Sequence, residues 1–252
     1  MTNDTGVVAW WKSFDAAPDE DLAREEGLLE AAAGGSPQLF AFSWDRPALV
    51  LGYGQRDLSA LDLEACRREG VLVLRRCTGG TAVFQRSDLS LSLALPSNHA
   101  WAGGIRGLYG RYLGCLQESL SSLGVEASRP AEDRAAPRSP ICFEGRGEDS
   151  LMIGGKKVAG GAQARRRRSV LVHIVVLFSL DAEMQSRIFR VPRERIELAM
   201  AAVPARPALS RGTLAAAFAA CLARHLGCSL DAKEAPPPLR ADATPRSWLA
   251  AP

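Results

Sequence analysis

Two adjacent lysines, Lys156 and Lys157, lie within the glycine-bracketed run 154–162. Lysine is rare in this chain, because only four of its 31 basic residues are lysines. An ammonium group is compact and can change its protonation state when buried, whereas a guanidinium stays charged and planar. Flanking glycines let the polar atoms of a ligand approach the backbone closely. The pattern predicts either a lysine that binds a ligand or a β-hairpin turn with two solvated lysines.

Cys142 is a second candidate, because a thiolate is a strong nucleophile for acyl transfer. It lies in the short apolar run 141–143, which we predict to be a strand, directly after a proline-containing loop at 128–140. Positive charge near such a cysteine favours the reactive thiolate. The alternative is an inert cysteine that packs in the core.

The segment 75–83 is a third candidate, at the end of a run typical of a buried strand. Arg75 and Arg76 could neutralise a carboxylate or a phosphate, and Gly79 and Gly80 could bring backbone N–H groups to the same ligand. The segment lacks the Gly-Lys-Ser/Thr ending of a nucleotide-binding P-loop. A plain turn between two strands is the alternative.

Two further clusters are not assigned a site. Four consecutive arginines at 165–168 have few aromatic neighbours for base stacking, and the net charge of the chain is only +3. Cys221, His225 and Cys228 lie at i, i+4 and i+7 on a predicted helix. A fourth metal ligand is missing there, and the same positions form an ordinary apolar face. We therefore predict neither nucleic-acid binding nor a metal site.

Strands and helices that do not alternate regularly must position these candidates. Strands are predicted at 7–14, 39–44, 48–51, 71–74, 82–84, 89–95, 141–143, 151–153 and 169–180, with a hairpin at the lysine pair. Helices are predicted at 18–33, 61–69, 105–123, 193–202 and 210–226. This order favours an α+β fold with a mixed, largely antiparallel sheet flanked by helices.

The length and the 47% of apolar residues fit one domain. We expect this domain at residues 1–230, followed by a proline-rich and poorly ordered tail at 231–252. Six scattered cysteines without a Cys-x-x-Cys pair favour free thiols in a reducing compartment. With no apolar run long enough for a membrane span and no secretory signal, we expect a monomeric cytoplasmic protein that binds no membrane.

In order and spacing, these segments resemble the catalytic domain of the lipoate–protein ligase and octanoyltransferase superfamily, which also includes the biotin protein ligases. The resemblance covers about residues 7–183. Residues 75–83 are similar to the family's Arg-Arg-x-[Ser/Thr]-Gly-Gly-x-Ala-Val, and residues 155–162 to its Gly-[Lys/Arg]-Lys-[Ile/Val]-x-Gly-Ser-Ala. The resemblance implies the fold of a biotin/lipoate protein ligase catalytic domain.

Cys142 makes the chain similar to the octanoyltransferase branch found in Gram-positive bacteria, where a cysteine at this place carries an acyl thioester. The ATP-using ligases of the superfamily usually lack that cysteine and often carry an accessory C-terminal domain. Here about seventy residues follow Asp181, and they look like two helices and a tail. Both features favour transfer over ligation.

The resemblance implies that Cys142 takes an octanoyl or lipoyl group from acyl carrier protein or another acylated donor and passes it to a lysine of a lipoyl domain. Lys157 would hold the acyl carbonyl, where its charge stabilises the developing oxyanion. Transfer would need no cofactor. The alternatives are a lipoate–protein ligase that uses ATP and Mg²⁺ through an acyl-AMP, and a weak or inactive relative that only binds lipoyl domains.

The residues implied in substrate binding are Arg75, Arg76, Thr78, Gly79, Gly80, Thr81, Ala82, Gly160, Gly161, Ala162 and His173. Among these, Gly79, Gly80 and Ala82 would line the acyl slot, since small residues leave room for the chain. The sequence departs from the family pattern at Thr81, Gln85, Gly161 and Ile174. These positions are candidates for a changed acyl-chain or acceptor specificity.

Overall fold

The computed structural model describes residues 6–14, 16–131, 139–234 and 237. The strands in this part of the chain are β1 (Val7–Ser13), β2 (Gln38–Phe42), β3 (Ala48–Leu51), β4 (Leu72–Arg75), β5 (Val83–Gln85), β6 (Leu89–Pro96), β7 (Ser150–Ile153), β8 (Lys156–Arg165), β9 (Ser169–Val176) and β10 (Ser229–Ala232). The helices are α1 (Pro18–Ala33), α2 (Leu63–Arg68), α3 (Ile105–Ser122), the 3-10 helix η1 (Cys142–Glu144), α4 (Ala182–Phe189), α5 (Arg193–Ala199) and α6 (Arg211–Leu226).

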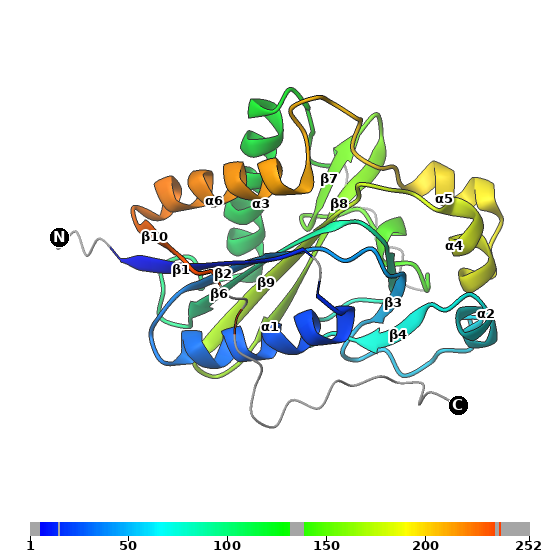
Figure 1. Ribbon diagram of the computed structural model, residues 1–252, viewed down its shortest axis with the longest axis horizontal. Helices are drawn as coiled ribbons and strands as arrows, with labels where there is room; N and C mark the ends of the chain where they lie inside the picture. The colour runs from blue at the N-terminus through cyan, green and yellow to red at the C-terminus, as the bar shows by residue number, and fades with distance from the viewer. Residues whose placement is uncertain (1–5, 15, 132–138, 235–236, 238–252) are drawn as a thin grey trace.

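Seven strands form the large sheet, in the order β10-β1-β2-β6-β9-β8-β7 (Figure 1). β1 pairs in parallel with both β10 and β2, and the other neighbours in this sheet pair antiparallel. The predicted fold, an α+β arrangement with a mixed and largely antiparallel sheet, is confirmed.

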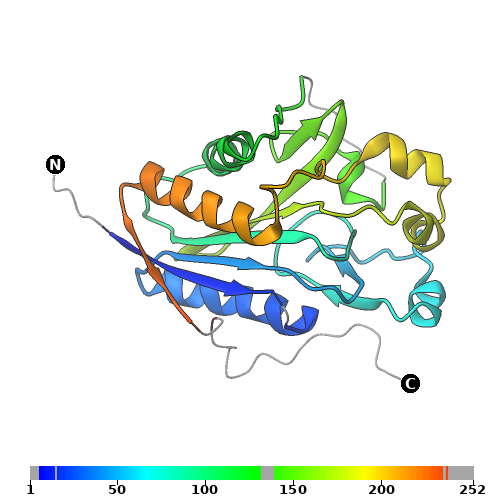
Figure 2. The same ribbon diagram turned by 45° about the horizontal axis from the view of Figure 1, so that its top comes forward.

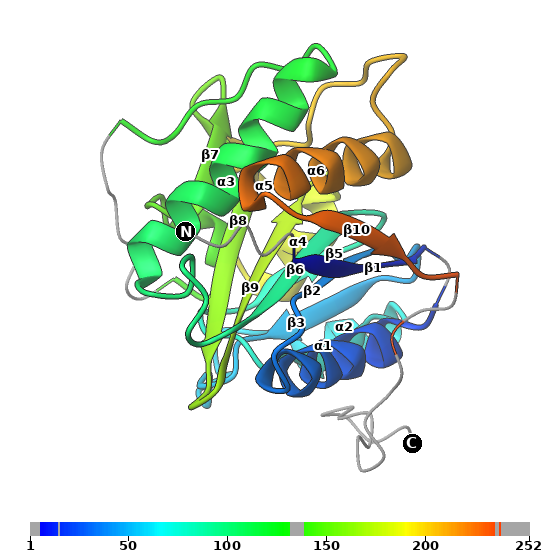
Figure 3. The same cartoon turned by 90° about the vertical axis from the view of Figure 1, so that its left-hand side faces the viewer.

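Helices cover both faces of this sheet. Figure 3 shows α1 on one face and α3 with α6 on the other. Side chains alternate accordingly along β9, where Leu171 and Val175 join one buried cluster and Val172 and Ile174 join the other. Of the helices in the described residues, none is long and apolar enough to cross a membrane.

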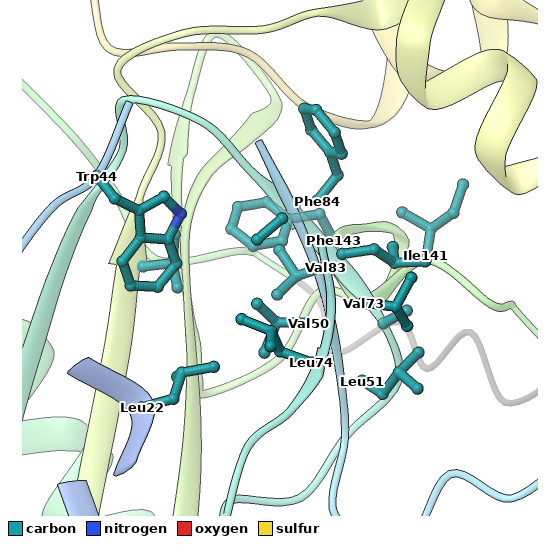
Figure 4. Packing of buried hydrophobic residues seen from close by; sticks show 14 of the residues in the cluster. Leu22, Trp44, Val50, Leu51, Val73, Leu74, Val83, Phe84, Ile141 and Phe143 are labelled. Atoms are coloured by element: carbon teal, nitrogen blue, oxygen red, sulfur yellow. The ribbon is translucent and has the colours of Figure 1, made fainter. Parts of the chain in front are cut away.

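A smaller sheet with the order β4-β3-β5 lies beside the large one (Figure 2). β4 runs parallel to β3, and β5 runs antiparallel to it. The loop from Arg76 to Ala82 joins β4 to β5, so this sheet positions the segment 75–83 (the arginine–glycine segment). Its apolar side chains pack against Ile141 and Phe143, which flank Cys142 in the chain (Figure 4).

The prediction of a strand at 141–143 is wrong. Ile141 makes only one isolated bridge, with Ala82, and the chain then turns into η1. The turn forms because the N–H of Glu144 donates to the carbonyl of Ile141 at 3.2 Å. A three-residue apolar run cannot by itself distinguish a strand from such a turn.

The region after β9 also differs from the prediction. The strand ends at Val176 instead of 180, and α4 follows, begun by the Asp181 carboxylate accepting the N–H of Met184 at 2.9 Å. The expected two helices are therefore three, and β10 adds an edge strand next to β1. Most of the expected tail, at 235–236 and 238–252, lies outside the described residues.

Asp88 ties the start of β6 to the end of β9, and its burial leads to a prediction about pH. Its carboxylate accepts the N–H groups of Phe178 at 2.9 Å and Arg86 at 3.1 Å. Burial raises the pKa of Asp88 from 3.8 to about 7 in the folded protein. The folded state therefore binds a proton more tightly than the unfolded state, and Asp88 makes stability fall as pH rises from about 4 to about 7.

We expect Asp88→Asn to remove this loss, which over the whole pH range is on the order of 4 kcal/mol at 1.36 kcal/mol per pKa unit. Urea unfolding at pH 5 and pH 8 measures it. The variant should gain stability relative to the unmodified chain at pH 8, and Glu183→Gln, at a side chain that is 61% exposed, should show no comparable gain. Equal effects of Asp88→Asn at both pH values would contradict the prediction.

Candidate active site

The segments that carry the predicted site residues meet at one end of the small sheet. The N–H of Cys142 donates to the carbonyl of Ala82 at 2.9 Å, and the N–H of Ala82 donates to the carbonyl of Pro140 at 3.1 Å. The N–H of Gly79 donates to the carbonyl of Gln163 on β8 at 3.3 Å. These backbone bonds hold three segments together: the turn η1 at Cys142, the loop 76–82 (the glycine loop) and strand β8, which carries Lys157.

Arg76 organises the glycine loop and brings a positive charge to the thiol. Its guanidinium donates to the carbonyl of Gly79 at 3.1 and 2.7 Å and to the carbonyl of Thr81 at 3.1 Å. Its Nη2 lies 3.9 Å from Cys142 Sγ. Arg76 is 4% exposed and Cys142 is half-buried, so the sulfur sits at the edge of the interior beside a fixed cation.

Gly80 allows this approach. Its φ of +91° lies in the region that favours glycine. A Cβ at this position would lie 2.7 Å from Arg76 Nη2 and 3.4 Å from Cys142 Sγ. Any side chain here would therefore push the guanidinium away from the thiol.

Arg75 turns away from the thiol and supports a neighbouring loop. Its Nη1 donates to the carbonyl of Gly52 and, at 3.2 Å, to the carbonyl of Tyr53. Thr78 is fully buried, and its carbonyl accepts the N–H of Tyr53 at 2.9 Å. Of the two neighbouring arginines, Arg76 is the one that contacts Cys142.

The lysine pair lies on a β-hairpin, as one of the two readings of the sequence predicts. Gly154 and Gly155 form the turn with φ values of +57° and +76°, and β7 and β8 pair on either side. The two lysines differ in exposure, because Lys156 is half-buried whereas Lys157 is 1% exposed. The turn is therefore present, but only Lys156 has appreciable contact with solvent.

Three groups hold the buried ammonium of Lys157. Its Nζ donates to the carbonyl of Gly145 at 2.9 Å and lies 3.5 Å from the Asp149 carboxylate. It also lies 5.1 Å from the ring centroid of Phe143, a distance typical of a cation–π contact. A buried cation needs such partners, because leaving water without compensation is costly.

Gly160 and Gly161 form a floor of small residues beneath these groups. A Cβ on Gly160 would lie 2.7 Å from Lys157 Cε and 3.2 Å from Phe143 Cε2. A Cβ on Gly161 would lie 3.0 Å from Cε1 of Tyr109, on α3. The serine typical of the family at position 161 would therefore press against Tyr109 here.

His173 and Ala162 lie opposite each other on β9 and β8. His173 Nδ1 lies 2.5 Å from Glu25 Oε1, on α1, and 3.1 Å from Ser92 Oγ. All three side chains are at most about 2% exposed as residues. His173 is thus part of a closed network beneath α1, and its role in substrate binding stays a prediction.

Three residues near Cys142 or Lys157 were not identified as site residues from the sequence: Tyr109, Phe143 and Asp149. Burial raises the pKa of Tyr109 so that its phenol stays protonated, and Cys142, Arg76 and Asp149 all act on it electrostatically. No local pattern marks Tyr109, because it lies 33 positions before Cys142 and reaches the site only through the packing of α3. Asp149 lies eight positions before Lys157, directly before β7. Its carboxylate was the one local sign of a charged partner for the lysine.

Comparison with known proteins identifies the family of the chain. Residues 17–208 match the family description of the lipoyl protein ligase A/B catalytic domain, and they make up more than half of the chain. The chain belongs to this family. Residues 75–83 and 155–162, which carried the resemblance, lie near Cys142 in the fold.

Two relatives of this catalytic domain are named Octanoyltransferase LipM. One, from Symbiobacterium thermophilum, is 32% identical over 242 residues, which cover 87% of this chain and 88% of the relative. The other, from Geobacillus kaustophilus, is 30% identical over 200 residues, which cover 74% and 72% of the two chains.

Solved structures show the same fold. A lipoate-protein ligase A bound with ATP superimposes with a TM-score of 0.74 at 22% identity, covering 90% of this chain and 88% of the ligase. A bipartite lipoate protein ligase from Thermoplasma acidophilum, described with its E2 lipoyl domain, gives a TM-score of 0.68 at 22% identity, covering 91% and 86%. At these identities the likeness concerns the fold alone.

Proposed function

We propose that this chain is an octanoyltransferase that carries the acyl group on Cys142 and passes it to a lysine of a lipoyl domain. The observation that carries the proposal is the half-buried Cys142 sulfur 3.9 Å from the Arg76 guanidinium. A cation at this distance stabilises negative charge on the sulfur, as an acyl-accepting thiolate requires. The two octanoyltransferase relatives support the octanoyl group as the cargo.

The reaction has two halves that balance. In the first, the Cys142 thiolate attacks the thioester carbonyl of an octanoyl carrier protein, the carrier leaves as a thiolate, and octanoyl-Cys142 forms. In the second, the neutral amine of the acceptor lysine attacks this thioester. An amide forms, the amine loses a proton to solvent, and the Cys142 thiolate is released.

Lys157 is proposed to stabilise the oxyanion in both halves. An ammonium has three N–H donors, and the Gly145 carbonyl and the Asp149 carboxylate take two of them. The third is the one that we propose to bind an acyl oxygen. Phe143, next to Cys142 in the chain, links the two proposed catalytic groups, since its ring contacts the ammonium.

This reaction requires neither ATP nor Mg²⁺, and we place it in the cytoplasm. All six cysteines, each within the described residues, are free, as expected for a protein in a reducing compartment. The proposed donor is acyl carrier protein or another acylated carrier, and the proposed acceptor is a lipoyl domain.

Intact-mass spectrometry after incubation with octanoyl–acyl carrier protein, without ATP, tests the proposal. We expect one octanoyl group on the unmodified chain, its location at Cys142 by peptide mapping, and its transfer to an added lipoyl domain. Cys142→Ser should abolish both steps. Cys228→Ser is the matched control, because Cys228 is also a half-buried free thiol, and it should leave both unchanged.

Acceptor modification that appears only with ATP and octanoate, and that survives Cys142→Ser, would replace transfer by ligation. Binding of the lipoyl domain without any modification would instead indicate a non-catalytic relative. Either result would overturn the proposed octanoyltransferase activity.

A further inference from the structure

A second cluster of reactive side chains lies between α3 and α6, which pack side by side on one face of the large sheet (Figure 3). The ligand atoms of Cys115, Cys221 and His225 all lie within 4.8 Å of one another. Cys221 and His225 are one helical turn apart on α6, as predicted from their spacing. The third member is Cys115 on α3, whereas the sequence pattern had suggested Cys228 as the third potential ligand.

Glu118 completes the cluster. It lies three residues after Cys115 on α3, and so on the same helix face. Its Oε2 lies 2.9 Å from His225 Nε2 and 3.2 Å from Cys221 Sγ. Each helix thus supplies two potential ligands, at i, i+3 on α3 and at i, i+4 on α6.

We propose that Cys115, Glu118, Cys221 and His225 bind a zinc-type divalent metal ion that joins α3 to α6. Two sulfurs, one imidazole nitrogen and one carboxylate oxygen are a donor set suited to tetrahedral Zn²⁺. With Zn–S bonds of about 2.3 Å, the two sulfurs would lie about 3.8 Å apart. The two sulfurs, which lie within 4.8 Å of each other, therefore need to approach by no more than about 1 Å, which side-chain rotation can supply.

The charges balance at this site. Two thiolates and one carboxylate around a divalent ion leave a net charge of −1. Arg224 offsets it, because its guanidinium pairs with Glu118 and lies 3.5 Å from Cys221 Sγ.

Binding displaces protons from the two cysteines. Each thiol loses one proton to solvent as its sulfur joins the ion, while His225 binds as the neutral imidazole. The site is open to ion entry on one side, because His225 and Glu118 are 48% and 51% exposed.

The full chain, prepared with a reductant and stripped of metal, can be titrated with Co²⁺ as a spectroscopic probe. We expect one equivalent to bind, with sulfur-to-cobalt charge-transfer absorption that Zn²⁺ then removes. Zn²⁺ at saturation should also raise Tm by roughly 5 °C, because it binds only the folded state. These measurements do not depend on acyl transfer, so their outcome is independent of the proposed activity.

His225→Gln and Cys221→Ser should each weaken Co²⁺ binding by about 100-fold or more. His225 is half-exposed, so its variant tests the site without disturbing the core. Cys228→Ser is the control and should bind as the unmodified chain does. The proposal is overturned by absence of the charge-transfer band, by an equal loss in Cys228→Ser, or by a Cys115–Cys221 disulfide that persists in the reduced preparation.

Discussion

Replacing Lys157 by methionine is expected to slow acyl transfer by about 10²–10³-fold, the usual effect of removing one oxyanion-stabilising donor. Methionine has nearly the length of lysine and no charge, so the apolar stem can keep its packing against Gly160 and Phe143. What is lost is the N–H proposed to bind the acyl oxygen and the ammonium that contacts Phe143, the residue after Cys142. Both the acylation of Cys142 and the transfer to the lipoyl domain should slow.

Lys156→Met is the matched control, because it removes the same charge from the adjacent, half-buried position. Rates of each half-reaction, measured by mass spectrometry, should be unchanged in this variant. Lys157→Arg should not retain activity, because a guanidinium is larger than an ammonium. There is no spare room beside Gly160, where even an added Cβ would lie 2.7 Å from Lys157 Cε. Equal rates in Lys157→Met and in the unmodified chain would remove Lys157 from the mechanism.

Gly52→Ala is expected to destabilise the protein by about 2–4 kcal/mol and to disorganise the glycine loop. A Cβ at Gly52 would lie 1.8 Å from the carbonyl oxygen of Gly80 and 2.6 Å from its carbonyl carbon. The neighbour is backbone, so no rotation of a side chain can relieve the overlap. The displaced loop is the one whose carbonyls hold Arg76 beside the thiol.

Gly54→Ala is the control, because it lies in the same loop and a Cβ added there would meet nothing within 4 Å. Urea unfolding measures stability, and the octanoyl adduct on Cys142 measures the state of the loop. Gly52→Ala should lower both, whereas Gly54→Ala should change neither by a comparable amount. A Gly52→Ala variant as stable and as readily acylated as Gly54→Ala would show that the loop adapts without cost.

The hairpin at the lysine pair shows where local pattern was sufficient. Two consecutive glycines with positive φ, between two runs of strand character, require a turn at 154–155 whatever the rest of the chain does. The alternating run at β6 and the Gly227 cap of α6 were predictable for the same reason. In each case the deciding interactions lie within a few residues.

Elements that depend on distant partners were predicted wrongly or missed. β10 is four residues long, and three of them are exposed polar or small residues, so only pairing with β1 makes it a strand. Cys142 lies in a turn and not in a strand, because Ile141 finds one bridging partner, Ala82, and no continuous neighbour. Short segments take their conformation from what they pack against.

By itself, the sequence determined the α+β class, the hairpin, and the candidacy of Cys142, Lys157 and the arginine–glycine segment, because these follow from residue type and local spacing. Only the tertiary structure decided that Arg76 and not Arg75 lies beside the thiol, and that Lys157 is buried while Lys156 is not. The tertiary structure also placed Cys115 of α3 close to Cys221 of α6. These outcomes depend on which side of a strand or helix faces its neighbours, and that is set by contacts between segments far apart in the chain.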